Sequence, residues 1–197
     1  MFRRVGLCIS LLLMSCQPLS ENAQALKKSL FAEGCTAPCW IGIQPGVTNV
    51  EDAKEILNKH YGQDVVLDRG PFEWSGGRKN NLDAGYAIVY DNIIQEIYIL
   101  FNIPVNQKEF ISILGEPTHV QVTGVNTCLG VNLWFKDDGI EAFLGYLDGT
   151  FKGVNETQPI WAIWMRTIKV TQELQVYDAA MIEWDGYKDY CEIVFGG

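Results

Sequence analysis

The chain has few of the residues and patterns that catalysis, nucleic-acid binding or a membrane span requires. Only two histidines occur among its 197 residues, and no catalytic triad, nucleophile motif or phosphate-binding loop is recognisable. Its 15 Lys and Arg against 24 Asp and Glu give a net charge of −9, which opposes binding to a phosphate backbone. No apolar run reaches the roughly 20 residues that cross a bilayer. We therefore expect no enzyme, no nucleic-acid partner, no cofactor and no bound metal.

The first sixteen residues have the pattern of an export signal. Residues 1–4 form a short positive region, and the mainly aliphatic residues 5–14 have the length of a secretory hydrophobic region. The sequence Leu13-Met14-Ser15-Cys16 resembles the lipobox of bacterial lipoproteins, in which the cysteine is acylated and the chain is cut before it. The resemblance implies that residues 1–15 are a cleaved signal peptide and that Cys16 carries lipid. The alternative is that residues 5–14 form a buried strand.

A lipidated Cys16 would anchor the protein to the cell membrane or the outer membrane, on the extracytoplasmic face. Each buried methylene group contributes about 0.8 kcal/mol, so two or three acyl chains hold a protein far longer than one. Without residues 1–15 the chain is still more acidic, and anionic lipid would repel it. We therefore expect the body to hang from a tether, residues 16–34, that includes a short helix over 22–33.

The four other cysteines that would remain after cleavage predict two disulfide bonds. An even number of cysteines in an oxidising compartment is typical of disulfides, and we favour a Cys35–Cys39 clip with a Cys128–Cys191 staple. The staple would close a loop of roughly 63 residues. The alternative is a thiol-redox or copper-handling site at Cys35 and Cys39, beside Trp40. The three-residue spacing and the Gly and Pro residues that follow argue against the helix of a thioredoxin-type motif.

The rest of the chain reads as an α+β protein of short helices and antiparallel strands. A capping box at Thr48 and Glu51 predicts a helix that ends near Tyr61, and a second helix is expected over 107–114 after a cap residue three before Glu109. Period-two patterns predict strands over 64–68, 86–90, 93–101, 118–124, 131–136, 140–147 and 160–168. The simplest architecture is therefore two tandem helix-plus-meander units, over 35–102 and 103–197, the second with a C-terminal extension.

The second of these units resembles a known family. Its helix, the stop Leu114-Gly115-Glu116-Pro117 and the later Phe135-Lys136-Asp137-Asp138-Gly139 are similar to the pattern of the SmpA/OmlA outer-membrane assembly lipoproteins. The tandem form is similar to the beta-lactamase-inhibitor-protein fold. The first unit departs from the pattern, because it has residues 58–62 in place of the Leu-Gly-x-Pro stop. The resemblance covers about residues 43–147. It implies a binding or assembly module without catalysis.

Aromatic residues are the most informative excess, with six Trp, eight Tyr and nine Phe. Large rings fill cores or form recognition surfaces because they bury much area at low entropic cost. We expect Trp40 and Trp134 to be in the core and Trp74, beside two glycines in a long connection, to be exposed. The candidate binding surface consists of Trp74, Trp161, Trp164 and Trp184.

The remaining polar candidates for chemistry have simpler structural interpretations. We interpret His60, at a helix end, and His119, at a strand start, as structural residues. Two acidic groups have the oxygen ligands that Ca²⁺ prefers but lack the spacing of a calcium loop, and are interpreted as solvated turn residues. These groups are Asp137 with Asp138, and Glu183 with Asp185 and Asp189.

Together these patterns predict a lipid-anchored, non-catalytic module that binds a protein or an envelope component. A thiol-redox or copper-handling lipoprotein is the alternative, and a hydrolase with an unrecognised acidic pair is a third hypothesis.

Overall fold

The computed structural model describes seven parts of the chain. They are residues 18–62, 72–75, 84–124, 128, 130–144, 154–169 and 181–195. The expected signal peptide, the lipidation site Cys16 and the expected strand over 64–68 lie outside the described residues.

The three helices expected from the sequence each begin or end within one residue of the predicted position. The helices are α1 (Glu21–Leu30), α2 (Val50–Tyr61), α3 (Gln107–Leu114) and α5 (Tyr190–Phe195). The prediction for α3 is confirmed at both ends, with the Asn106 side chain accepting a hydrogen bond from Glu109 N as its cap. Helix α1 ends at Leu30, earlier than expected. Helix α5 lies in the expected C-terminal extension and was not predicted.

The cap of α2 differs from the predicted capping box. Asn49 is the cap, and its side chain accepts a hydrogen bond of 2.9 Å from Asp52 N. Thr48 instead accepts a hydrogen bond from Gln44 N through its hydroxyl. Its carbonyl accepts from Ile94 N. Helix α2 therefore begins one residue later than the capping box predicts. The backbone of Thr48 is instead hydrogen-bonded to Ile94, which belongs to a strand, and Thr48 does not act as the cap.

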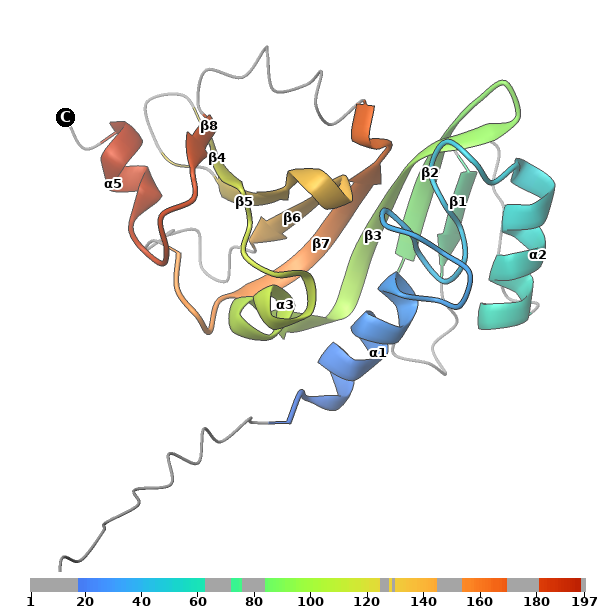
Figure 1. Ribbon diagram of the computed structural model, residues 1–197, viewed down its shortest axis with the longest axis horizontal. Coiled ribbons are helices and arrows are strands. Elements are labelled where there is room, and N and C mark those ends of the chain that lie inside the picture. Colours follow the sequence, from blue (N-terminus) through green and yellow to red (C-terminus); the bar gives the residue numbers. More distant parts are fainter. Residues whose placement is uncertain are drawn as a thin grey trace, which may run out of the picture.

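Eight strands form one antiparallel sheet (Figure 1). In sheet order they are β1 (Phe72–Ser75), β2 (Ala84–Tyr90), β3 (Ile93–Asn106), β7 (Pro159–Arg166), β6 (Ile140–Leu144), β5 (Gly130–Phe135), β4 (His119–Thr123) and β8 (Met181–Glu183). The predicted α+β class is confirmed. Strand β1 lies within a stretch that the sequence predicts as a loop, and a short helical turn, η1 (Lys136–Asp138), joins β5 to β6.

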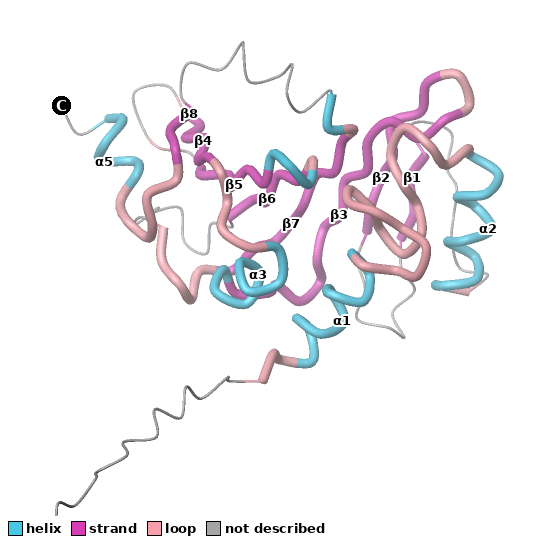
Figure 2. The backbone as a smooth tube through the Cα atoms, viewed as in Figure 1, coloured by secondary structure: helices cyan, strands magenta, loops and turns pink. Residues whose placement is uncertain are grey.

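Two meanders are joined by the pairing of β3 with β7. The β2–β3 hairpin turns at Asp91 and Asn92, which both have the positive φ that a two-residue hairpin turn needs (Figure 2). Strand β3 then continues through residues 102 and 103, the predicted boundary between the two units. It pairs with β7, with Glu96–Leu100 opposite Arg166–Ala162. The sheet is therefore continuous from the first meander to the second.

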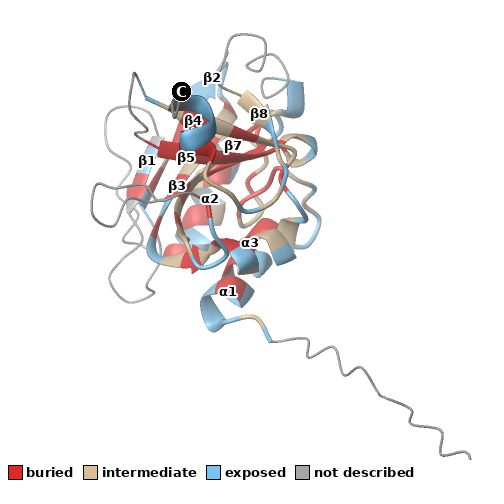
Figure 3. Ribbon diagram, turned by 90° about the vertical axis from the view of Figure 1, so that its left-hand side faces the viewer, coloured by how far each residue is buried: buried red, intermediate tan, exposed pale blue. Residues whose placement is uncertain are grey.

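The helices pack on one face of this sheet, and that side holds the core (Figure 3). Side chains from α1, α2, α3 and α5 belong to the same buried cluster as alternate residues of the strands. From the helices they include Leu26, Leu57, Phe110 and Tyr190, and from the strands Ile97, Ile99, Val120, Leu133, Ile140, Ala142, Ile163 and Met165. In each strand, the side chains that alternate with these core residues lie on the other face of the sheet.

Both predicted disulfide bonds are present. Cys35 is bonded to Cys39 with their Cα atoms 6.1 Å apart, and Cys128 is bonded to Cys191 with theirs 5.5 Å apart. The second bond ties α5 to the segment before β5, as the predicted connectivity requires.

Candidate functional site

The face of the sheet opposite the core carries an unusual set of polar and aromatic side chains. Cross-strand partners in an antiparallel sheet lie on the same face, so the register defines this set. We call it the polar-aromatic face. It consists of Tyr86, Glu96, Tyr98, His119, Gln121, Asn132, Trp134, Glu141, Phe143, Trp164 and Arg166.

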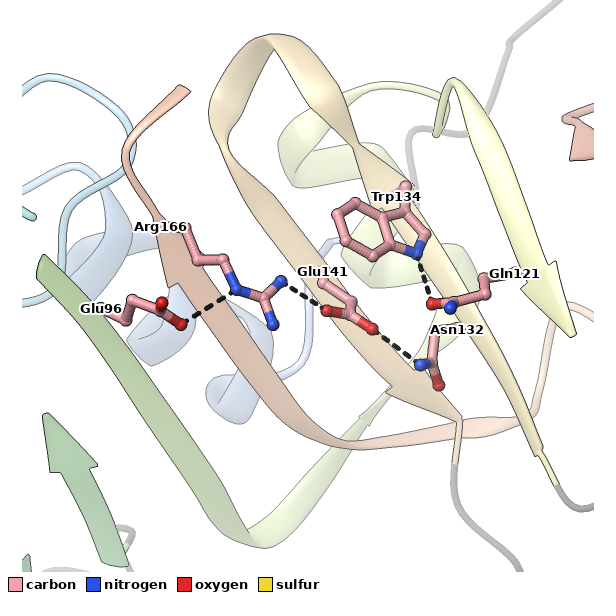
Figure 4. A network of polar contacts seen from close by, with 6 residues as sticks. All are labelled: Glu96, Gln121, Asn132, Trp134, Glu141 and Arg166. Carbon is pink, nitrogen blue, oxygen red and sulfur yellow. Dashed lines mark hydrogen bonds and ion pairs between the residues drawn. The ribbon is translucent and has the colours of Figure 1, made fainter. Parts of the chain in front are cut away.

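Arg166 is the centre of a polar network that crosses four neighbouring strands (Figure 4). Its Nε donates to Glu96 Oε2 at 3.0 Å and its Nη1 donates to Glu141 Oε2 at 2.7 Å. The other oxygen of Glu141, Oε1, accepts from Asn132 Nδ2 at 2.7 Å. Glu96, Arg166, Glu141 and Asn132 come from β3, β7, β6 and β5 in that order, so one chain of hydrogen bonds links both meanders.

The network is largely buried. The side chains of Arg166 and Glu141 are 7% and 5% exposed, whereas that of Glu96 is 20% exposed. Charged groups are buried at a high cost in solvation, which is tolerated only when they are paired and hydrogen-bonded. Two carboxylates on one guanidinium leave this cluster with one excess negative charge. The centre of the face is therefore acidic as well as polar.

Aromatic rings surround the guanidinium group. The guanidinium carbon of Arg166 lies 3.8 Å from the ring centre of Trp164 and 5.6 Å from that of Trp134. Trp134 is itself held by a hydrogen bond of 3.1 Å from its indole nitrogen to Gln121 Oε1. These contacts fix the plane of the guanidinium group between its two carboxylate partners.

Four rings pack against one another beside this network. Tyr86 stacks on Tyr98 with ring centres 5.0 Å apart, and Trp164 meets Tyr98 edge-on at 6.0 Å. Phe143 closes the cluster at 5.8 Å from Tyr98 and 6.4 Å from Trp164. All four side chains are half-buried, so part of each remains accessible. Such rings are available for contact with a partner at little further cost in side-chain entropy.

The two tyrosines keep their protons at neutral pH. Burial raises the pKa of Tyr86, and the nearby charge of Glu96 raises it further. Burial also raises the pKa of Tyr98, with smaller contributions from Tyr86 and Glu141. Each hydroxyl can therefore donate as well as accept a hydrogen bond.

Exposed aliphatic side chains flank these rings on the first meander. Leu100 is 45% exposed and Ile88 is 39% exposed. Leu100 lies opposite Ala162, and Ile88 lies opposite Glu96, so both belong to the same side of the sheet as the rings. The accessible part of the face therefore combines apolar contact area with acidic and hydroxyl groups.

A second polar contact lies near the β4 edge of the face. Lys136 Nζ is 2.6 Å from His119 Nε2. An ammonium group can only donate, so Nε2 accepts and the imidazole is neutral with its proton on Nδ1. Burial lowers the pKa of His119, and the charge of Lys136 lowers it further. Burial also lowers the pKa of Lys136. His119 therefore has a defined contact within the fold.

One of the tryptophans proposed from sequence as a binding surface lies in the polar-aromatic face. Trp164 is part of it, whereas Trp161 occupies the position where the β6–β7 register shifts. Trp184 packs on Tyr190 with ring centres 6.0 Å apart, beside the core. Trp40 and Trp134 are buried as expected, at 1% and 3% exposure, although Trp134 points to the polar-aromatic face and not to the main core.

The expected exposure of Trp74 is wrong. Trp74 is 3% exposed and lies in β1 opposite Gly85, whose neighbour across the sheet is the core residue Ile99. A Cβ atom at Gly85 would lie 2.7 Å from Trp74 Cε2, so the missing side chain makes room for the indole. The ring is thus directed to the core by a glycine on the adjacent strand, which the glycines next to Trp74 in sequence do not indicate.

Cys39 is fully buried and Cys35 half-buried, and their sulfurs are bonded to each other. Within the described ranges no group of three or more His, Cys, Asp or Glu side chains has a geometry that could hold a metal ion. In the same ranges no helix is both long and apolar enough to cross a bilayer.

Comparison of the chain with protein-family models, with characterised proteins and with solved structures finds no match. The resemblance of about residues 43–147 to assembly lipoproteins therefore remains a prediction.

The Arg166 network was not predicted, although part of its signal is visible in the sequence. Glu96 and Tyr98 alternate with apolar residues in one strand, and Trp164 and Arg166 do so in another. This period-two pattern places each pair on one face. Neither segment indicates that its strand pairs with the other, because Glu96 and Arg166 are 70 residues apart in the sequence.

Proposed function

We propose that the protein is a lipid-anchored, extracytoplasmic lipoprotein that binds a protein or an envelope component through the polar-aromatic face. The observation that carries this proposal is the Tyr86, Tyr98, Phe143 and Trp164 cluster packed around the Arg166 network on the face opposite the core. The lipobox at Cys16 supports the anchor and the location.

The composition of the face favours partner binding. Tyr, Trp and Arg are the residues that most often dominate interface energy, and they contribute most when they are held rigidly in partly buried positions. Here stacking and ion pairs already fix the rings and the guanidinium group, so binding would order few side chains. The exposed Leu100 and Ile88 add apolar area at one side of the rings.

The state of the carboxylates supports a role without catalysis. Glu96 and Glu141 both bind the Arg166 guanidinium group, and Glu141 also accepts from Asn132. A general acid or base needs a proton position that substrate can reach. A thiol-redox role needs thiols that exchange readily, whereas Cys39 is fully buried and bonded to Cys35.

A site-specific crosslinking experiment tests the binding proposal. A photoreactive phenylalanine analogue replaces Leu100 on the polar-aromatic face, and in a matched variant it replaces Glu55, an exposed residue of α2 on the opposite side. We expect a discrete crosslinked product in intact cells from position 100 and not from position 55. Equal labelling at the two positions, or none at position 100, would contradict a partner on this face.

The anchor is tested separately from the binding face. Intact mass analysis of the protein extracted from its native membrane should give residues 16–197 with acyl chains. Replacement Cys16→Ala should abolish acylation and release the protein from the membrane fraction. A mass without acyl chains, or an unchanged fractionation of the variant, would contradict the lipoprotein assignment and leave the binding face untouched.

A further inference from the structure

A pocket of about 310 Å³ lies between the C-terminal ends of α1 and α2, away from the polar-aromatic face. One helix face supplies Ala25, Lys28 and Ser29, at the spacing that brings side chains together along a helix. The other lining residues are Phe31, Ala32, Glu33, Ile41 and His60. Most of these are apolar or small, and the volume is that of a site for a small molecule.

The walls of the pocket are held by the surrounding structure. Ile41 N donates to Ser29 O at 2.7 Å, which ties the loop after the Cys35–Cys39 bond to α1. Ile41 has a φ of 49°, a rare conformation for a β-branched residue. His60 meets the ring of Tyr61 edge-on at 4.8 Å. Backbone strain of this kind persists where the surroundings over-determine it, and such places concentrate at binding sites.

The titratable side chains of the pocket are Lys28, Glu33 and His60. Lys28 comes from α1 and His60 from the last turn of α2, and Glu33 is the acidic residue of the lining. Burial lowers the pKa of His60, and the positive charge of Lys28 lowers it further. At pH 7 the imidazole is therefore mostly neutral, and an anion held beside Lys28 and His60 would favour its protonated form and raise its pKa.

We propose that this pocket binds a small amphipathic carboxylate, with its aliphatic chain against Phe31 and Ile41 and its carboxylate between Lys28 and His60. The apolar lining selects the chain and the Lys28 ammonium group selects the negative head, beside which the His60 imidazole can donate a hydrogen bond or take up a proton. Glu33 opposes the anion and limits its affinity. This inference holds whether or not the polar-aromatic face binds a partner.

The two histidines make the test direct, because His119 lies in a different part of the fold and serves as an internal reference. The full chain, reconstituted in phosphatidylcholine nanodiscs, is titrated with hexanoate while the imidazole signals are followed by NMR. We expect saturable shifts of the His60 signals, a rise in the pKa of His60, and no matching change at His119. Hexanol, which has the chain without the charge, should bind more weakly.

Charge variants provide matched controls. Lys28→Gln should weaken hexanoate binding about two- to fivefold, the effect of losing one solvent-accessible ion pair. Glu33→Gln should strengthen it, and Lys27→Gln, on the same helix outside the lining, should leave it unchanged. Equal affinities in the Lys27 and Lys28 variants, equal binding of hexanol and hexanoate, or parallel shifts of both histidines would overturn the proposal.

A steric variant tests the location independently of charge. Ala25→Phe places a ring in the pocket from an exposed position of α1, whereas Gln24→Phe adds the same ring one residue away, outside the lining. We expect the first variant to lose hexanoate binding and the second to keep it. Because both positions are exposed, both variants should fold, and circular dichroism confirms this before the titration. Retained binding in the Ala25 variant would place the ligand elsewhere.

Discussion

Replacement of Arg166 by Met tests whether the polar network is buried and paired as described. Met keeps much of the side-chain volume but removes the charge and both ion pairs. The carboxylate of Glu141, whose side chain is 5% exposed, then remains in a poorly hydrated site without its cation. Removing one partner of a buried ion pair costs about 3–5 kcal/mol because the other charge is left uncompensated.

This cost should be visible as a large loss of thermal stability. For a chain of this size, a loss of 1 kcal/mol in the free energy of unfolding lowers the midpoint of thermal unfolding by about 2–4 °C. Arg166→Met should therefore lower this midpoint by roughly 6–20 °C. The double variant Arg166→Met, Glu141→Gln should recover part of the loss, because the buried charge is gone and Asn132 keeps a partner. Glu96→Gln should cost about 1 kcal/mol, since Glu96 is partly solvated.

Urea denaturation of the parent, the single variants Arg166→Met and Glu141→Gln, their double variant and Glu96→Gln, with Lys54→Met as a control, completes the test. Lys54 pairs with Glu51 on the surface of α2, where the Glu51 side chain is 75% exposed. Loss of this ion pair should change the free energy of unfolding by less than about 1 kcal/mol. If Arg166→Met costs no more than Lys54→Met, the guanidinium group is hydrated. If the Arg166 and Glu141 effects are additive, the two side chains are not coupled, and either result refutes the reasoning.

Three further changes have expected outcomes that follow from single contacts. Gly85→Ala should destabilise the fold by about 1–3 kcal/mol, because the new methyl group collides with Trp74. Replacement of Cys128 and Cys191 by Ser should cost about 4 kcal/mol on the chain-entropy model, given a separation of 63 residues. His119→Gln should reduce the loss of stability on acidification. Burial and Lys136 lower the pKa of His119, so the unfolded chain takes up its proton first, near pH 6.5, and stability falls below that pH.

These three outcomes are measured by urea denaturation. A Gly85→Ala variant as stable as the parent would mean that Trp74 does not fill the space above this glycine. Serine variants that unfold at the same urea concentration as the parent would argue against the Cys128–Cys191 bond in solution. Parallel curves of stability against pH for the parent and the His119 variant would show that this imidazole titrates normally.

Local signals in the sequence were sufficient for the elements whose ends depend on neighbouring residues. Helix α3 has the predicted bounds because Asn106 and Glu109 form its cap from within one turn. Strands β2 and β3 include the predicted ranges 86–90 and 93–101, and Asp91 and Asn92 between them have the positive φ of a hairpin turn. The cap of α2 was misplaced by one residue, since the carbonyl of Thr48 bonds to a distant strand.

What the sequence by itself determined is therefore the α+β class, most of the elements and the expectation of two disulfide bonds among four cysteines. These depend on periodicity, on turn chemistry and on an even count of thiols, all of which are local or compositional. The tertiary structure alone decided that β3 pairs with β7, that Trp74 is buried and that Glu96 meets Arg166. Strand register and helix packing bring together residues far apart in the chain, and no short segment encodes which of the possible neighbours it will meet.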